Sequence, residues 1–154
     1  MTMPMPWTYR HASKEWRAIL DDLKSRMGLV SDNSAYTALD GVLQVFRRHL
    51  TAQQGLDFAS VLPSVQRAVF VAAWRVEGEP LPFDDRSAMT REVTEIRKNH
   101  NLTPDNAIEA AASTLRRDVN KEDFERVLTR LPEGAGQFWH MDAADPRYIS
   151  PRIF

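Results

Sequence analysis

Two pairs of adjacent arginines are the residues whose type and spacing best suit a binding site. Arg47-Arg48 and Arg116-Arg117 occur 69 positions apart. Guanidinium groups bind carboxylates and phosphates through paired N–H donors, so four of them on a common surface would form an anion-binding site. There is also a simpler structural explanation, because a cation in the last turn of a helix is stabilised by about 0.3–1 kcal/mol by the helix dipole.

The residue types that usually carry catalysis or bind metals are absent or poorly spaced. The sequence has no cysteine, which excludes disulfides, thiolate metal sites and cysteine nucleophiles. It has neither a Gly-x-Ser-x-Gly elbow nor a glycine-rich phosphate loop. None of the histidines is spaced from another like a pair of helix-borne zinc ligands; they are His11, His49, His100 and His140. We expect no metal, no cofactor and no enzymatic activity, and an enzyme with dispersed catalytic residues is the least favoured alternative.

The acidic pairs and two of the histidines have structural explanations. Asp84-Asp85 and Glu122-Asp123 stand at predicted helix starts, where negative charge complements the helix dipole. His49 and His100 fall near predicted helix C-termini, where a positive charge is favoured. Adjacent side chains on a helix also point about 100° apart, so neither acidic pair is expected to converge on one ligand.

Trp7 is the residue best placed to contact a partner protein. It follows a stretch rich in methionine and proline, and residues 1–12 are expected to form a mobile N-terminal segment. Aromatic side chains are enriched in protein interfaces. Trp74 and Trp139 end predicted helices, so they are expected in the core or between parts of the fold instead.

Length and composition describe an ordinary globular protein. The chain has 154 residues, of which 43% are hydrophobic and 27% charged, enough for one domain with a buried core. The net charge of −1 gives no overall attraction to nucleic acid or to an acidic membrane surface. The longest apolar run, residues 68–74, is too short to cross a bilayer, and the start lacks a secretory signal. We expect a cytoplasmic protein that binds neither membranes nor nucleic acid.

The two halves of the sequence match at an offset of 69 residues, which indicates an internal duplication. Leu62-Pro63 matches Leu131-Pro132, and the two arginine pairs match each other. A unit of about 60 residues would be only marginally stable alone. The sequence therefore predicts an all-α fold in which two tandem four-helix units pack as one helical body.

Helical spacing and capping residues predict the helices of the first unit. The first helix covers residues 13–27. Asp32 or Ser34 can cap the second, and Thr51–Gln54 has the form of a capping box that opens the third. Pro63 suits the first turn of the fourth helix, where its missing N–H would be unbonded anyway.

The second unit repeats this plan. Thr103-Pro104 is expected to start its second helix as a cap and a first-turn proline, and Asn120 is expected to cap the third. The fourth, from Pro132, is expected to be short because it contains two glycines. The matched positions expected in the core are Leu39, Val42, Phe46, Phe58, Leu62, Phe70, Ile108, Ala111, Leu115, Val127, Leu131 and Trp139.

Proline and glycine mark the expected boundaries. Residues 75–85 contain one glycine and two prolines and have neither helical nor strand periodicity, so they are predicted to link the units. The first unit then covers residues 13–74 and the second residues 86–140. Residues 141–154 contain two further prolines and are predicted to form an extended tail.

A series of short motifs follows the predicted helices. In chain order they are Trp16, Ile19-Leu20, Ala35-Tyr36-Thr37-Ala38-Leu39, Leu62-Pro63, Ala73-Trp74, Leu131-Pro132 and Phe138-Trp139. In this order, from about Tyr9 to His140, they resemble a bacterial family, domain-of-unknown-function family 2267. The resemblance implies an all-helical fold and a bacterial source. It implies no reaction, and no catalytic residue can be carried over from it.

Two functions fit these expectations. The first is a non-enzymatic interaction or scaffold protein that offers a helical surface to an unknown protein partner or to a second copy of itself. The alternative is a module that binds nucleic acid or another anion through Arg47, Arg48, Arg116 and Arg117. Nucleic-acid binding weakens steeply with salt and an apolar protein interface does not, so a salt titration separates the two.

Overall fold

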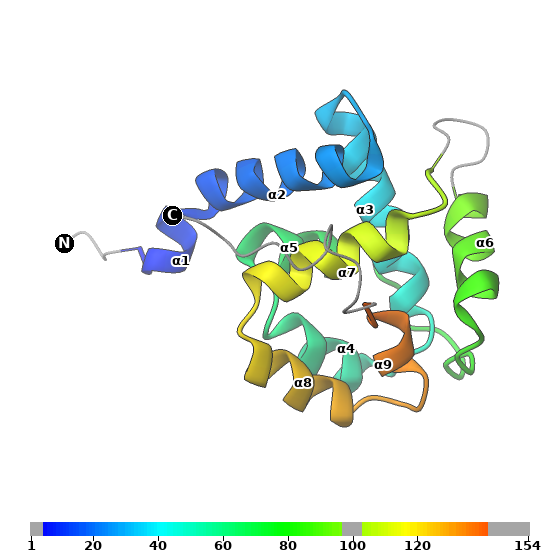
Figure 1. Ribbon diagram of the computed structural model, residues 1–154. Coiled ribbons are helices and arrows are strands. Elements are labelled where there is room, and N and C mark those ends of the chain that lie inside the picture. The colour runs from blue at the N-terminus through cyan, green and yellow to red at the C-terminus, as the bar shows by residue number, and fades with distance from the viewer. Residues whose placement is uncertain (1–4, 97–102, 142–154) are drawn as a thin grey trace.

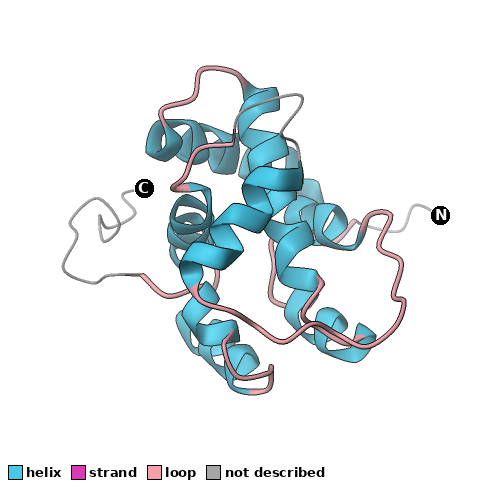
Figure 2. Ribbon diagram, turned by 90° about the vertical axis from the view of Figure 1, so that its right-hand side faces the viewer, coloured by secondary structure: helices cyan, strands magenta, loops and turns pink. Residues whose placement is uncertain are grey.

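The computed structural model describes residues 5–96 and 103–141, and that part of the chain consists of α-helices and loops without a strand (Figures 1 and 2). The all-α prediction is therefore confirmed. No helix in the described part is long and apolar enough to cross a membrane. The helices are α1 (Trp7–Arg10), α2 (Ala12–Met27), α3 (Asp32–Arg47), α4 (Ala52–Ala59), α5 (Ser64–Val71), α6 (Arg86–Ile96), α7 (Ala107–Asp118), α8 (Lys121–Thr129) and α9 (Ala135–Phe138).

Several helix boundaries follow the predicted capping residues. α2 ends at Gly28, which has a φ of +69°, a conformation that glycine adopts without a Cβ clash. Thr51 and Gln54 form the predicted capping box of α4, and the Asn120 side chain accepts from the Asp123 N–H at the start of α8.

Other helix starts differ from the prediction by one to four residues. The cap of α3 is Ser31, whose hydroxyl accepts from the backbone N–H of Ser34, so neither Asp32 nor Ser34 caps it. α7 begins at Ala107 rather than at Thr103-Pro104, because residues 104–107 form a turn closed by a 3.1 Å bond from the Ala107 N–H to the Pro104 carbonyl. Pro63 immediately precedes α5 instead of lying in its first turn.

Both ends of the chain extend beyond the described residues. α1 is a single helical turn inside the segment 1–12 that was predicted to be mobile. α9 begins only after Gly134, whose φ is +101°. Of the predicted tail, residues 141–154, only Met141 is among the described residues; residues 142–154 and His100 lie outside them.

The helices of the two predicted units pack among one another. α2 packs against α3 and α5 of its own unit and also against α7, and its counterpart α6 packs against α3, so the first helix of each unit contacts the second helix of the other. α3 and α7 also contact each other near the centre, and α4 contacts α8 (Figure 1). The described residues between 13 and 140, which leave out 97–102, therefore form one body rather than two separate domains.

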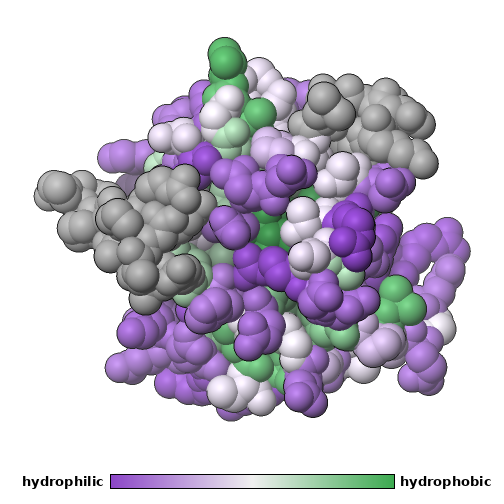
Figure 3. Space-filling view, turned by 45° about the vertical axis from the view of Figure 1, so that its right-hand side comes forward, coloured by the Kyte–Doolittle hydropathy of each residue, from purple (hydrophilic) through white to green (hydrophobic). Residues whose placement is uncertain are grey.

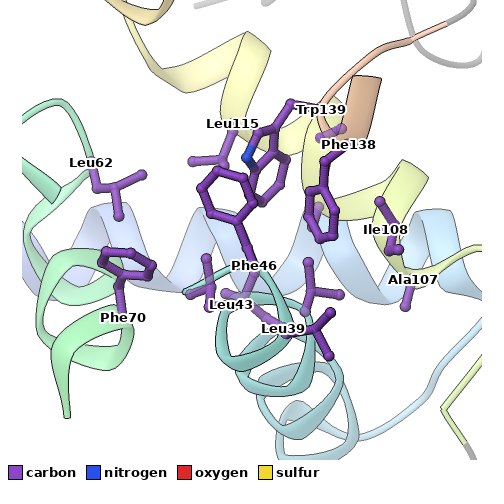
Figure 4. Close-up of a cluster of buried hydrophobic side chains, with 14 of the residues drawn as sticks. Leu39, Leu43, Phe46, Leu62, Phe70, Ala107, Ile108, Leu115, Phe138 and Trp139 are labelled. Atoms are coloured by element: carbon purple, nitrogen blue, oxygen red, sulfur yellow. The ribbon is translucent and has the colours of Figure 1, made fainter. Parts of the chain in front are cut away.

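All twelve side chains predicted for the core are buried. The centre is aromatic: the Phe46 ring lies 5.2 Å from that of Trp139, and the Phe58 ring stacks on Trp139 at 5.6 Å. Figure 4 shows Phe46 of α3 pointing toward Trp139 and Phe138, with leucines of α3 and α7 around them. Residues from both units therefore share a single core.

Candidate functional site

Arg47 is engaged within the fold. Its Nη1 donates to the backbone carbonyls of Phe70 and Ala72, at 2.9 and 3.0 Å, at the C-terminal end of α5. The guanidinium also lies over the Trp74 ring, 5.8 Å from its centroid. Partial burial lowers the pKa of Arg47, an effect that the charge of Asp40 opposes. Arg47 thus satisfies carbonyls that helix α5 leaves without an internal partner.

Arg116 makes the matching contact in the second unit. Its Nε donates to the Trp139 carbonyl at 2.8 Å, and Trp139 is the residue 69 positions after Phe70. Its Nη1 forms an ion pair with Glu125 at 2.7 Å, and its guanidinium lies 5.0 Å from the Phe124 ring centroid. The first arginine of each pair therefore fastens the end of the fourth helix of its own unit.

The second arginines of the pairs differ from each other. Arg117 pairs with Asp22 of α2 at 3.0 Å and with Asp118, whose charge and hydrogen bond raise the pKa of Arg117 despite its burial. The side chain of Arg48 is 46% exposed and lies 3.8 Å from Glu92 of α6. Arg117 thus connects α7 to α2, and Arg48 faces α6 across a longer gap.

The polar contacts between α2 and α7 centre on Asp22. Its Oδ2 accepts from the Thr114 hydroxyl at 2.7 Å and from the Arg26 Nε at 2.8 Å. The side chain of Asn106 adds a bond to the Arg26 carbonyl. The Asp22 carboxylate therefore joins α2 to α7 through Thr114 and Arg117.

The first arginine pair lines a cavity of about 390 Å³ between the end of α3 and the chain that follows α5. Arg47, Arg48 and Arg75 contribute positive charge, and Glu77 and Glu79 contribute negative charge. Arg75 pairs with Glu77 at 3.0 Å. Arg116 and Arg117 lie at the end of α7, outside this cavity, so the structure does not assemble the four arginines into one site.

The electrostatics of this cavity are mixed. It lies at the C-terminal end of α3, where helix carbonyls carry partial negative charge and disfavour an anion. Arg47 is already bonded to carbonyls, which leaves Arg48 and Arg75 to face a ligand. Within residues 5–96 and 103–141 no group of three or more histidine or acidic side chains could hold a metal ion.

His49 is buried and has a structural role. The sequence predicted only that it would lie near a helix C-terminus. It is 3% exposed, its Nδ1 lies 3.0 Å from the Leu81 carbonyl, and its ring stacks on Phe83. Its Nε2 lies 3.6 Å from a carboxylate oxygen of Glu92. His49 therefore anchors the predicted linker to the end of α3. No spacing rule signals such a contact, because its partners are backbone carbonyls more than 30 residues away.

Trp7 lies on α1 at one end of the molecule, as Figure 1 shows. Its side chain is 69% exposed, and its ring lies 4.4 Å from that of His11. Trp74 is partly buried and Trp139 fully buried, so they belong to the fold as predicted. Of the three, Trp7 is the one available for contact with another molecule.

Comparisons with known proteins identify a family. A family model described as "Uncharacterized conserved protein (DUF2267)" matches residues 16–138. None of the curated proteins compared with the chain matches it. The family match begins within α2, at residue 16, ends with α9 and includes all four arginines; α1 and Trp7 precede it.

Proposed function

Because the chain belongs to the DUF2267 family, whose description names no reaction, we propose its function from its surface: a non-enzymatic, cytoplasmic protein-interaction module. The observation that carries the proposal is α1. None of its four residues is buried, and two of them are aromatic. Trp7 and Tyr9 are 69% and 50% exposed, and the preceding Met5 is 57% exposed. Large aromatic side chains commonly supply the central contacts of a protein interface.

The rest of the visible surface supports α1 as the contact element. Figure 3 shows one face of the molecule, where hydrophobic side chains form small separate groups among hydrophilic ones. Scattered apolar residues of this kind are ordinary on a soluble surface. α1 differs because two of its four residues are exposed aromatic side chains, on a short helix that precedes the shared core.

Partner capture with matched variants tests the proposal. The tagged wild-type chain is compared in its own cell extract with Trp7→Ser/Tyr9→Ser and with Leu56→Ser, a control that removes an exposed apolar side chain from α4. We expect the aromatic variant alone to lose the captured protein, by about tenfold or more if one aromatic hot spot is removed. Equal capture by all three chains, or no protein enriched above a tag-only sample, would contradict it.

The cavity beside Arg47 and Arg48 favours anion binding as a second candidate function. Two guanidinium groups there, those of Arg48 and Arg75, are exposed enough to meet a phosphate. Titration of the protein with a short duplex at several salt concentrations tests this. A tight complex that weakens steeply with salt and is lost in Arg48→Gln/Arg75→Gln would favour this candidate over the interaction module.

We also infer that the two units arose by duplication. The inference is supported by the equal offset of two contacts: Arg47 to the Phe70 carbonyl, and Arg116 to the Trp139 carbonyl. The contacts of α2 with α7 and of α6 with α3 support it further, because the first helix of each unit packs against the second helix of the other.

A further inference from the structure

A second cavity, of about 700 Å³, opens between the start of α6 and the chain before α9. Its apolar part is formed by Pro82, Phe83 and Pro132. Gly134 has a φ of +101°, and a Cβ on it would overlap the Phe83 side chain, so only glycine lets the two walls approach this closely. The cavity is separate from both α1 and the arginine cavity.

Arg86 holds the two walls of this cavity together. It lies at the start of α6, and its Nη2 donates to the carbonyls of Gln137 and His140, at the end of α9, at 2.9 and 2.6 Å. Its guanidinium is therefore used within the fold. A ligand that entered the cavity would not have to order these walls, which lowers the entropic cost of binding.

The border of the cavity carries negative charge. Asp84 and Asp85 each use one carboxylate oxygen to accept a backbone N–H, from Asp85 and Ala88 respectively, at 2.8 Å. Glu133 is exposed and forms no hydrogen bond or ion pair with another described residue. Glu133 is therefore the carboxylate that can receive a cation beside the apolar wall.

The opposite charge stands beside the exposed aromatic residues of α1. Trp7 and Tyr9 are followed by Arg10, the last residue of α1, and by Lys14 in the first turn of α2. Both cations are exposed, and neither forms an ion pair with another described residue. This end of the molecule presents aromatic rings with cations, and the cavity presents an apolar wall with a carboxylate.

We propose that α1 of one copy binds in this cavity of a second copy, an inference that rests on α1 being the contact element proposed above. The Trp7 ring lies against Phe83 and Pro132 of the second copy, because a large aromatic ring gains most from leaving water. The Arg10 guanidinium pairs with the Glu133 carboxylate of the second copy, a pairing in which two parallel N–H bonds can form.

The positions of α1 and the cavity make this a contact between different molecules. α1 packs against α2, and Ser64 at the start of α5 donates to the Thr8 carbonyl at 3.4 Å. Figure 1 shows α1 on the far side of the molecule from α6 and α9. Because each copy carries one α1 and one cavity on different sides, copies add head to tail into a chain or ring and do not close a symmetric dimer.

Analytical ultracentrifugation of complementary variants tests the proposal. Trp7→Ser/Tyr9→Ser disables α1, and Glu133→Lys/Gln137→Lys disables the cavity. We expect the average mass of the wild-type chain to rise with concentration beyond that of two copies, and each variant alone to stay monomeric. An equal mixture of the two variants should form dimers and nothing larger, because one working α1 then meets one working cavity.

A control and a charge exchange locate the contact. Gln53→Lys/Glu122→Lys makes the same residue changes at exposed positions of α4 and α8 and should associate like the wild type. Arg10→Glu and Glu133→Arg should each abolish association, and one chain that carries both changes should recover it. Salt should lower the average mass of the wild-type chain by screening this pair, a readout that needs no variant to fold.

Three results would overturn the proposal: a wild-type chain that stays monomeric, a cavity variant that still associates, or a variant mixture that forms no dimer. Association of the wild type that is insensitive to salt would also contradict the pairing of Arg10 with Glu133. If the wild type stays monomeric and Trp7→Ser/Tyr9→Ser still loses a captured protein, the interaction module stands and only the second copy is excluded as its partner.

Discussion

The two units place an aromatic ring beside the same arginine in different ways. In the first unit the ring belongs to Trp74, which follows α5, and it fits because position 55 is glycine: a Cβ there would lie 2.2 Å from the indole. In the second unit, position 124, which lies 69 residues after Gly55, is itself an aromatic residue. The Phe124 ring takes the place beside Arg116.

The comparison shows which contacts the two predicted units have in common. Both units keep the arginine, the carbonyl it bonds and the ring that contacts its guanidinium. The residue that supplies the ring changes, because a ring from α8 removes the space for a ring from the end of the last helix. The Trp74 ring can take its place beside Arg47 only because residue 55 has no side chain, so the position of Trp74 depends on Gly55.

The largest predicted loss of stability comes from removing the aromatic residue at the end of the second unit's fourth helix, and the matching change in the first unit should have a smaller effect. Trp139→Ala should lower the free energy of unfolding by about 3–5 kcal/mol, as expected for a fully buried aromatic side chain. Phe70→Ala should lower the free energy of unfolding by less. The Trp139 ring contacts aromatic rings of both units, which are Phe46, Phe58, Phe124 and Phe138. Urea denaturation followed by circular dichroism measures both. Equal midpoints for the two variants would show that the core is not shared in this way.

The arginines test whether the matched contacts are equally strong. Arg47→Met and Arg116→Met should each cost about 1.5–3 kcal/mol, because each removes a hydrogen bond from a charged donor to a backbone carbonyl. This exceeds the 0.3–1 kcal/mol that the helix dipole alone would give. Arg48→Gln is the control and should change stability by less than about 0.5 kcal/mol. If all three variants lost a similar small amount of stability, the helix dipole alone would explain Arg47 and Arg116, and the hydrogen bonds to the carbonyls would contribute nothing measurable.

A double-mutant cycle tests the pairing of Gly55 with Trp74. Gly55→Ala should destabilise the protein by about 1–3 kcal/mol, because the new methyl group displaces the indole. In a Trp74→Ala background the same change should be neutral or stabilising by up to about 1 kcal/mol, since alanine favours a helix. The free energies of unfolding of the four chains give the coupling. Additive effects would refute the contact.

The smallest predicted effect is a gain. Gly41 lies in the middle of α3, where a Cβ would meet Val93 of α6 at an ordinary distance of 3.7 Å. Gly41→Ala should therefore raise the free energy of unfolding by about 0.5–1 kcal/mol through helix propensity. A thermal melt is sufficient to measure it. A lower melting temperature would indicate that α3 and α6 pack more tightly than these distances suggest.

Sequence periodicity predicted the helices and the core well, because burial leaves a regular apolar pattern along each helix. It also placed the arginine pairs at helix ends, but it did not reveal that Arg47 and Arg116 bond carbonyls of another helix. It likewise did not predict the burial of His49 or the contact between Gly55 and Trp74. Such contacts join elements that are distant along the chain and leave no local pattern.

The start of α7 illustrates the same limit. Thr103-Pro104 has the sequence of a helix start, yet the helix begins at Ala107. Asn106 stands at the N-cap without a side-chain capping bond, and its Nδ2 donates to the Arg26 carbonyl at the end of α2. The local capping pattern gives no sign of this tertiary contact, because its partner lies 80 residues away.

The packing of α2 against α7 has a consequence for how the chain folds. The bond from Thr114 to Asp22 joins residues 92 positions apart, and that from Asn106 to Arg26 joins residues 80 apart. Closing such long loops costs entropy before any contact compensates for it, so folding slows as the mean sequence separation of contacts rises. Although all its described secondary structure is helical, this protein should fold more slowly than an up-and-down bundle of the same length. The part of α2 that packs against α7 stays uncovered until α7 has left the ribosome, although α3 and α5 can already pack against α2.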